Sequence, residues 1–404
     1  MPTSFSALDA LLVAVLLATA WWLARPAVSR NRLWQATVTP LASIIGSGFL
    51  VLGPLLDNAY GGYAPLAMAL LCAAAWVMGA AVRFNIARLD AQGHDRSSAE
   101  RRLERMASWA LSGAYVISVT YYLNLFGSFG VSLTPLHETL HGRLLTSAVL
   151  LVILGVGWTK GFKALEGLEQ VSVTVKLAVI AALAAGLAVH FGEAGAAGTL
   201  HADAPRETGW QALTLGFGLI VTVQGFETSR YLGATYDAPT RIRSMRLAQI
   251  IATLIYLVYI ALVSYAVASP EGAVHETAVI GMMREVAPVL PLLLVVAALS
   301  AQFSAAVADT VGCGGLVEEE SGGRLGERQA YGVLVAVGLA LTWTSGVFEI
   351  IAYASRAFAL YYALQAAIAA LGARREGRMH LAAGFALVAA LALAVTVFGT
   401  PAEG

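Results

Sequence analysis

The chain has 404 residues, of which 58% are hydrophobic and only 12% are charged. A water-soluble domain carries roughly twice that share of charged residues, so this composition excludes a soluble globular protein and indicates an integral membrane protein. The 25 basic residues balance the 25 acidic residues, which gives no reason to expect a nucleic acid partner.

Apolar segments of the length that a membrane-spanning helix needs recur along the whole chain. Twelve such segments lie at 7–25, 36–57, 63–85, 106–132, 143–160, 168–191, 209–234, 245–269, 286–312, 328–345, 347–371 and 379–398. The first lacks a convincing cleavage site, so we interpret it as a retained helix and not as a removable signal. No soluble domain interrupts the series. We therefore expect one all-α transmembrane domain over 1–404, with about twelve helices.

Lys and Arg gather in alternate loops between these segments. The basic stretches lie at 25–32, 83–105, 160–163, 241–246, 324–328 and 374–378, and the loops between them carry few bases. Because cytoplasmic loops of membrane proteins are enriched in Lys and Arg, these stretches predict the cytoplasmic side of the inner membrane. Both termini are then expected outside.

Two of the apolar segments contain glycines in mid-membrane, where each glycine costs about 1 kcal/mol relative to alanine in a helix. The second segment reads Ile45-Gly46-Ser47-Gly48-Phe49, and the seventh reads Val223-Gln224-Gly225-Phe226-Glu227. Five is an odd number, so a five-helix unit repeated in tandem inserts with opposite topology, as in many transporters. We expect inverted repeats at 36–191 and 209–371, with extra helices at 7–25 and 379–398. Alternatively, the glycines only allow close packing between helices.

Unwound segments leave backbone N–H and C=O groups and half-helix dipole ends free to bind a carboxylate and an ammonium group. The expected ligand is a zwitterion or an amine, bound between the two breaks. The predicted substrate-binding residues are Ile45, Gly46, Ser47, Gly48, Phe49, Tyr121, Thr222, Val223, Gln224, Gly225 and Phe226. For Tyr121, a packing role is the alternative.

Four stretches together resemble the amino acid-polyamine-organocation (APC) transporter superfamily, whose members have the LeuT-type fold of two inverted five-helix repeats. They are Ile45 to Leu50; Gly225-Phe226-Glu227 with Asp237-Ala238-Pro239-Thr240-Arg241; Lys160 to Lys163 leading to Thr174-Val175-Lys176-Leu177; and Ser300, Ser304 and Asp309. The loop after the third helix lacks the acidic-leucine and Pro-x-x-Gly-Gly elements usual there. The resemblance therefore indicates a remote subfamily.

This resemblance implies a secondary transporter that moves an amino acid or related amine by alternating access. In sodium-independent relatives, a lysine at the position matching Lys176 takes the place of a sodium ion and contacts the first broken helix. Proton coupling or exchange through Lys176 is then expected. From the residues alone, a cation in a membrane helix costs a few kcal/mol unless it is solvated or paired, and snorkelling to the interface is the alternative.

Two acidic residues in the apolar segments have open interpretations. Glu227, beside the second break, either gains and loses a proton during transport or pairs structurally with Arg230 three residues on. Asp309 and Arg356 are expected to form an interhelical ion pair with a structural role.

His137-Glu138-Thr139-Leu140-His141 matches the H-E-x-x-H zinc motif, so a membrane zinc metalloprotease is an alternative of another class. The motif falls in a short external loop after Pro135, and no third ligand follows at a known spacing. We therefore predict a carrier and not an enzyme, with no cofactor and no metal site. A carrier of a small inorganic cation such as potassium is the remaining alternative.

Overall fold

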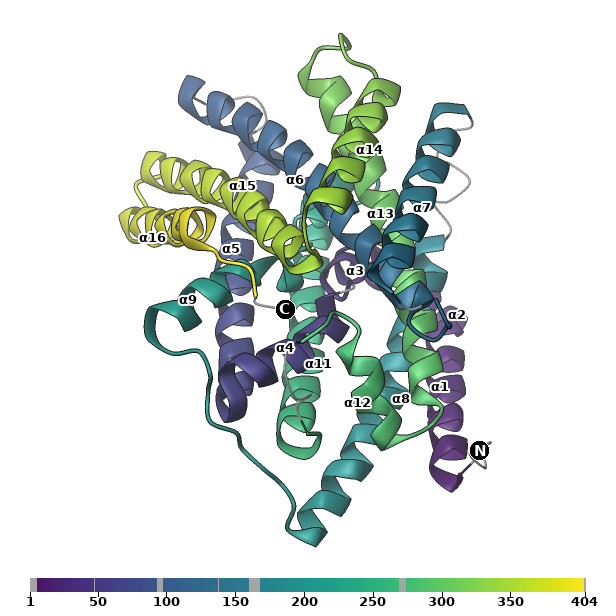
Figure 1. Ribbon diagram of the computed structural model, residues 1–404. Helices are drawn as coiled ribbons and strands as arrows, with labels where there is room; N and C mark the ends of the chain where they lie inside the picture. Colours follow the sequence, from purple (N-terminus) through teal and green to yellow (C-terminus); the bar gives the residue numbers. More distant parts are fainter. Residues whose placement is uncertain are drawn as a thin grey trace.

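A computed structural model describes residues 6–46, 48–92, 97–136, 138–159, 168–268 and 274–402. Throughout these ranges the regular structure is helical (Figure 1). The helices are α1 (Ala7–Ala24), α2 (Pro26–Ser29), α3 (Arg32–Ile44), α4 (Gly48–Tyr60), η1 (Gly61–Tyr63), α5 (Ala64–Gln92), α6 (Ser98–Val131), α7 (Thr139–Thr159), α8 (Leu168–Ala197), α9 (Gly209–Gly218), η3 (Ile220–Val223), α10 (Thr228–Tyr231), η4 (Leu232–Ala234), α11 (Ala238–Ala266), α12 (Ala278–Val286), α13 (Leu290–Glu320), α14 (Glu327–Thr344), α15 (Val347–Arg375) and α16 (Met379–Phe398).

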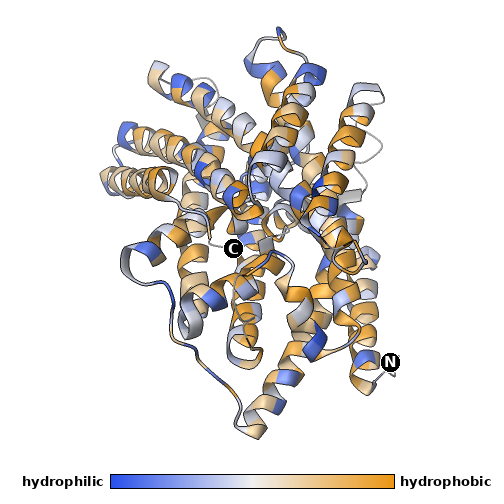
Figure 2. Ribbon diagram, in the orientation of Figure 1, coloured by the Kyte–Doolittle hydropathy of each residue, from blue (hydrophilic) through white to orange (hydrophobic). Residues whose placement is uncertain are grey.

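Each predicted apolar segment overlaps one or more of these helices. Among the described residues, nine helices are long and apolar enough to cross a membrane, and apolar residues run along most of the bundle (Figure 2). The helices on either side of the second break and α14 are not among these nine. The chain is therefore a multi-pass membrane protein, and the count of twelve spans stays a prediction.

Polar residues at the helix starts explain where several long helices begin. Ser97 accepts the backbone N–H of Glu100, whose carboxylate in turn accepts the N–H of Ser97, so a reciprocal capping box starts α6. Asp237 accepts the N–H of Thr240 at the start of α11, where Pro239 occupies the first turn. Hydrogen bonding from Thr240 also lowers the pKa of the Asp237 carboxyl.

The two apolar segments that contain these glycines are interrupted, and they meet inside the bundle. The α4 helix packs against η3, and α10 packs against α3. Around this crossing lie α5, α6, α8, α11, α13 and α15 (Figure 1). The two glycine breaks are thus buried in protein, which is where irregular backbone is tolerated at membrane depth.

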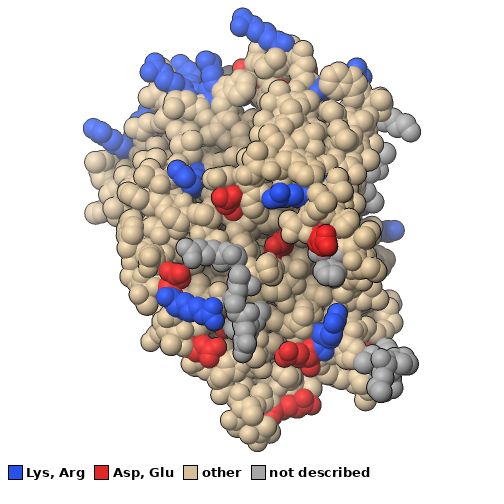
Figure 3. Space-filling view, in the orientation of Figure 1, with Lys and Arg blue, Asp and Glu red and all other residues tan. Residues whose placement is uncertain are grey.

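Lys and Arg gather at the upper end of the molecule in Figure 3. We call this the arginine-rich end; the start of α6, the turn between α13 and α14, and the end of α15 lie there (Figure 1). The N-terminus lies away from it (Figure 1). This asymmetry has the form that the positive-inside rule requires, while the side that faces the cytoplasm stays a prediction.

Candidate functional site

The first break separates α3 from α4. The α3 helix ends at Ile44, and Ile45 leaves the helical conformation with φ −83° and ψ 55°. The next helix starts at Gly48. Ser47, a predicted substrate-binding residue, lies outside the described residues. The interruption falls on the predicted glycine pair.

The second break is longer. The α9 helix ends at Gly218, a single 3-10 turn spans Ile220–Val223, and Gln224 is extended with φ −96° and ψ −179°. Regular helix resumes only at Thr228, in the short α10. The predicted residues from Thr222 to Phe226 therefore lie in the last part of the 3-10 turn and in the non-helical segment after it.

Glycines allow the two breaks and their neighbours to touch. Gly225 has φ +116°, and a Cβ added there would lie 2.5 Å from the Ser43 Oγ and 2.7 Å from the Ser43 carbonyl carbon. A Cβ on Gly48 would lie 2.9 Å from both the Thr222 Cβ and the Tyr121 hydroxyl oxygen. Any larger residue at Gly48 or Gly225 would push these segments apart.

Tyr256 of α11 links the two breaks. Its hydroxyl oxygen lies 2.6 Å from the Thr222 carbonyl oxygen and 2.9 Å from the Ile44 carbonyl oxygen. A hydroxyl group has a single hydrogen to donate, so the two carbonyl groups share one donor. Tyr256 is completely buried and was not among the predicted site residues.

Aromatic side chains surround the crossing. The Phe49 ring lies 4.4 Å from the Tyr259 ring, and Phe226 stacks on Tyr362 of α15 at 5.0 Å with 24° between the ring planes. Tyr121 lies 5.1 Å from the ring of its neighbour on α6. The predicted aromatic residues are therefore all buried and packed against other aromatic rings.

Glu227 binds the backbone of its own break. Its carboxylate accepts the Gly225 N–H at 3.0 Å and lies 2.5 Å from the Tyr362 hydroxyl oxygen, which is also 2.7 Å from the Gln224 side-chain oxygen. Glu227 is 1% exposed. The carboxylate and Tyr362 therefore hold the second break in its unwound shape.

The alternative in which Glu227 pairs with Arg230 is not what the structure shows. Arg230 instead forms an ion pair with Glu104 of α6 and donates to the Gln365 side-chain oxygen of α15 at 2.7 Å. Since α10 is only one turn long, the three-residue spacing does not bring the two side chains together on a regular helix. Arg230 ties α10 to α6 and α15.

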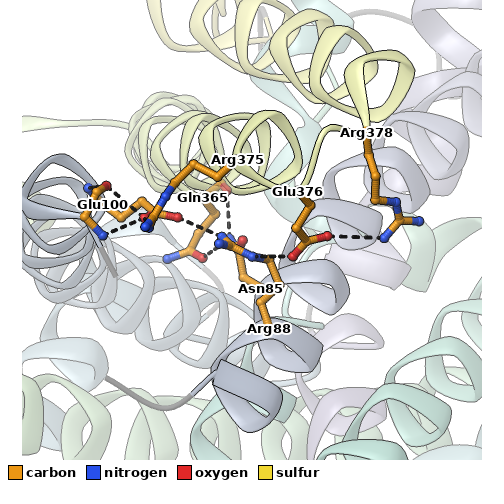
Figure 4. A network of polar contacts seen from close by, with 8 residues as sticks. Asn85, Arg88, Glu100, Gln365, Arg375, Glu376 and Arg378 are labelled. Carbon is orange, nitrogen blue, oxygen red and sulfur yellow. Dashed lines mark hydrogen bonds and ion pairs between the residues drawn. The ribbon is translucent and has the colours of Figure 1, made fainter. Parts of the chain in front are cut away.

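Gln365 also accepts the side-chain amide of Asn85 on α5 at 2.9 Å, and a network of charged residues lies beside this contact at the arginine-rich end (Figure 4). Glu100, which is completely buried, forms ion pairs with Arg88 and Arg375, both at 2.7 Å. Arg88 also forms an ion pair with Glu376 at 2.8 Å. Through these contacts, charged side chains connect α5, α6, α10 and α15 at one end of the molecule.

Lys176 on α8 reaches the first broken helix. Its Nζ donates to the Ala42 carbonyl oxygen at 2.9 Å, in the last turn of α3 before the break. The side chain is buried among the helices, so the amine does not reach the interface as the snorkelling alternative requires. Lys160 and Lys163, from the same resembling stretch, lie outside the described residues.

The predicted ion pair between Asp309 and Arg356 is wrong. The Ser118 hydroxyl donates to Asp309, and Arg356 donates to the Thr396 carbonyl oxygen of α16 at 2.8 Å. On the same helix as Asp309, the Ser300 hydroxyl donates to the Ser172 hydroxyl of α8 at 3.1 Å. Asp309 and Arg356 thus each bind a different partner from the one expected.

The H-E-x-x-H segment lies at the start of α7. His137 is outside the described residues, and Thr139 is the first residue of the helix. Among the residues that the structure describes, no group of three His, Cys, Asp or Glu side chains is placed to hold a metal ion.

The fold and the crossing define a class: a helical membrane carrier in which two interrupted helices meet at a central site. The sequence model of a family described as "APC superfamily transporter" matches residues 26–399, so the chain belongs to the APC superfamily of transporters. That is a family of transporters, which disfavours the metalloprotease alternative.

Similar proteins agree with this assignment. An uncharacterized protein of Aquifex aeolicus (strain VF5) is 39% identical over 386 residues, which cover 94% of this chain and 93% of that protein. Among solved structures, a substrate-bound, outward-open Na+-coupled sialic acid symporter is similar with a TM-score of 0.54 at 14% identity, covering 98% of this chain and 97% of the other. A manganese transporter of Eremococcus coleocola has a TM-score of 0.56 at 14% identity, covering 91% and 86%. Both have the LeuT-type fold, which is therefore the fold of this chain.

Proposed function

We propose that this transporter moves an amino acid or related amine across the inner membrane, by alternating access around the two crossed breaks, without sodium. The observation that carries the proposal is the Lys176 Nζ bound to the Ala42 carbonyl oxygen at 2.9 Å. The Lys176 ammonium group takes the position that a coupling sodium ion would otherwise occupy beside the first break. Protons are the expected coupling ion, in symport or exchange.

The half-helix ends at the crossing suit a zwitterion. The α4 helix starts at Gly48, and the first N–H groups of a helix lack partners within it and carry a partial positive charge. These N–H groups can donate hydrogen bonds to the carboxylate of the cargo. On the other side, the Thr222 and Ile44 carbonyl oxygens share the single Tyr256 hydrogen, which leaves acceptor capacity for an ammonium group.

Protonation of Lys176 biases the position of α3. The last turn of α3 carries a partial negative charge, and a cation beside it is stabilising. The neutral amine keeps its hydrogen-bond donors but loses this charge interaction. Loss of the Lys176 proton therefore weakens the interaction between α8 and α3. Glu227 is the second proposed coupling residue, because its carboxylate holds the Gly225 N–H and a protonated carboxyl would hold it less strongly.

The test is uptake of a panel of labelled amino acids and amines into proteoliposomes, with and without an inward proton gradient. We expect uptake of at least one member to be stimulated by the gradient. The informative pair of variants is Lys176→Met, which removes the charge, and Lys176→Arg, which keeps the charge but cannot release a proton. Both should lose gradient stimulation while remaining folded. Stimulation that survives in Lys176→Arg would overturn the coupling role.

A small inorganic cation is the second candidate cargo, because the manganese transporter shares the fold over 91% of this chain. Rubidium and manganese uptake therefore belong in the same panel. Cation uptake with no amine uptake would replace the amino acid proposal.

For the orientation, we propose that the arginine-rich end faces the cytoplasm and that both termini lie outside. A carboxy-terminal alkaline phosphatase fusion should be active, and the corresponding green fluorescent protein fusion should be dark. The reverse pattern would invert the topology.

A further inference from the structure

The residues that follow α16 contact the rest of the helix bundle. Gly399 donates its N–H to the Val395 carbonyl oxygen at 3.0 Å, and Thr400 donates its N–H to the Thr214 carbonyl oxygen of α9 at 3.0 Å. In Figure 1 the yellow trace after α16 runs from that helix toward the middle of the molecule. We call residues 399–402 the strap.

The strap fits tightly against the end of α9. A Cβ added to Gly218 would lie 1.8 Å from the Thr400 carbonyl oxygen and 2.8 Å from its carbonyl carbon, so no other residue allows this approach. The Gly218 carbonyl oxygen accepts the Ser355 hydroxyl of α15 at 2.6 Å. The strap thus covers the point where α9 and α15 are joined, two residues before η3 begins.

The far end of the strap reaches a polar cavity. Ala402 lines a space of about 290 Å³ together with Asn124 and Ser128 of α6, Arg143 of α7 and Glu276. Ala402 also packs against the main hydrophobic core. The strap therefore lies between this cavity and the end of α9, beyond which the second break begins.

We infer that the strap is a plug on the path from the polar cavity to the crossed breaks, and that it withdraws when that side opens. This inference rests on the alternating access proposed above. In the proposed opening, α9 moves away from α15. The strap contacts α9 through Thr400, whereas the end of α16 is bound by Arg356 of α15. Its Thr400 and Pro401 side chains are exposed, so few contacts resist its release.

The test measures access to the break without any cargo. The two native cysteines are first removed by Cys72→Ala and Cys313→Ala. In this background, Thr222→Cys reports access to the second break, and Ser128→Cys reports access to the polar cavity outside the strap. Both cysteines are modified in detergent with a positively charged methanethiosulfonate reagent. Gly218→Ala displaces the strap by steric overlap. Thr400→Pro removes the N–H donated to Thr214. Gly384→Ala, on α16 with no atom within 4 Å of the added Cβ, is the matched control.

We expect Gly218→Ala and Thr400→Pro to speed modification of Thr222→Cys about ten-fold, because modification of a buried group follows the population of its open state. The rate at Ser128→Cys and the rates in Gly384→Ala should not change. If Gly218→Ala aggregates, the modification rate in Thr400→Pro alone tests the plug. An unchanged Thr222→Cys rate in a monodisperse variant would overturn the plug. Since no cargo is used, failure of the uptake panel would not affect this result.

Discussion

Gly225→Ala tests the contact between the two breaks. Gly225 has φ +116°, a conformation that residues with a side chain rarely adopt. The Cβ of an alanine there would lie 2.5–2.7 Å from atoms of Ser43. Backbone strain of this kind costs about 1–3 kcal/mol, and forced overpacking costs about as much again. We therefore expect a loss of about 2–6 kcal/mol in the free energy of unfolding.

The assay is the apparent melting temperature of purified protein, measured as the monodisperse fraction that survives heating. Gly198→Ala is the matched control, because Gly198 has φ +69° with no atom within 4 Å of the added Cβ. Gly198→Ala therefore introduces backbone strain without a steric overlap. Ser43→Gly removes two of the overlapping atoms, so in a double-mutant cycle it should recover part of the Gly225→Ala loss.

The reasoning fails if Gly225→Ala is no more damaging than Gly198→Ala. Equal losses would mean that the two breaks do not touch at this point. A cycle without coupling between Ser43→Gly and Gly225→Ala would lead to the same conclusion.

Three further substitutions test the buried polar groups by the same melting assay. Glu100→Gln should lower the free energy of unfolding by about 2–3 kcal/mol, because it breaks the ion pairs with Arg88 and with the half-exposed Arg375. An unchanged melting temperature would contradict the buried pairing. Gln302→Leu should raise the free energy of unfolding by about 1–3 kcal/mol, since Gln302 is fully buried and its amide atoms have no hydrogen-bond partner among the described residues. Destabilisation would show that the Gln302 amide has a hydrogen-bond partner. Tyr256→Phe should cost about 1–3 kcal/mol by leaving two buried carbonyl groups without their donor. Tyr259→Phe, whose hydroxyl is 3.3 Å from its acceptor, should cost less, and the reverse order would refute the linking role of Tyr256.

The breaks and helical segments were predictable because the signals are local. Glycines inside an apolar run mark a weak point in a helix wherever they occur. The family resemblance rested on these two breaks together with further short stretches along the chain, and the comparison with known families confirms it. The roles of the individual site residues stay proposals.

The partners of the charged residues were not predictable. Arg230 binds Glu104, which is 126 positions away in the sequence, whereas one of the two sequence-based interpretations paired it with Glu227, three residues before it on an assumed regular helix. Asp309 likewise binds Ser118 across 191 positions. Such pairs depend on how helices pack, and the spacing of charges within one helix carries no signal of them.

Tyr256 and Tyr362 escaped prediction for a related reason. A tyrosine in a membrane helix has an apolar body and a polar tip, so its position in the sequence does not distinguish packing from hydrogen bonding. Only the fold places their hydroxyl groups on the two breaks.

The depth of the breaks has an electrical consequence. The α9 helix has 10 residues, which at 1.5 Å per residue is about 15 Å, or half of the hydrocarbon core. Moving one charge through the whole membrane costs about 2.3 kcal/mol per 100 mV, so a charged cargo that reaches the crossing feels about half of that. A zwitterion feels almost none. With the zwitterionic cargo and the Lys176 coupling proposed above, voltage dependence of transport would arise from the movement of the protein's own charges, Lys176 foremost among them, and not from the cargo.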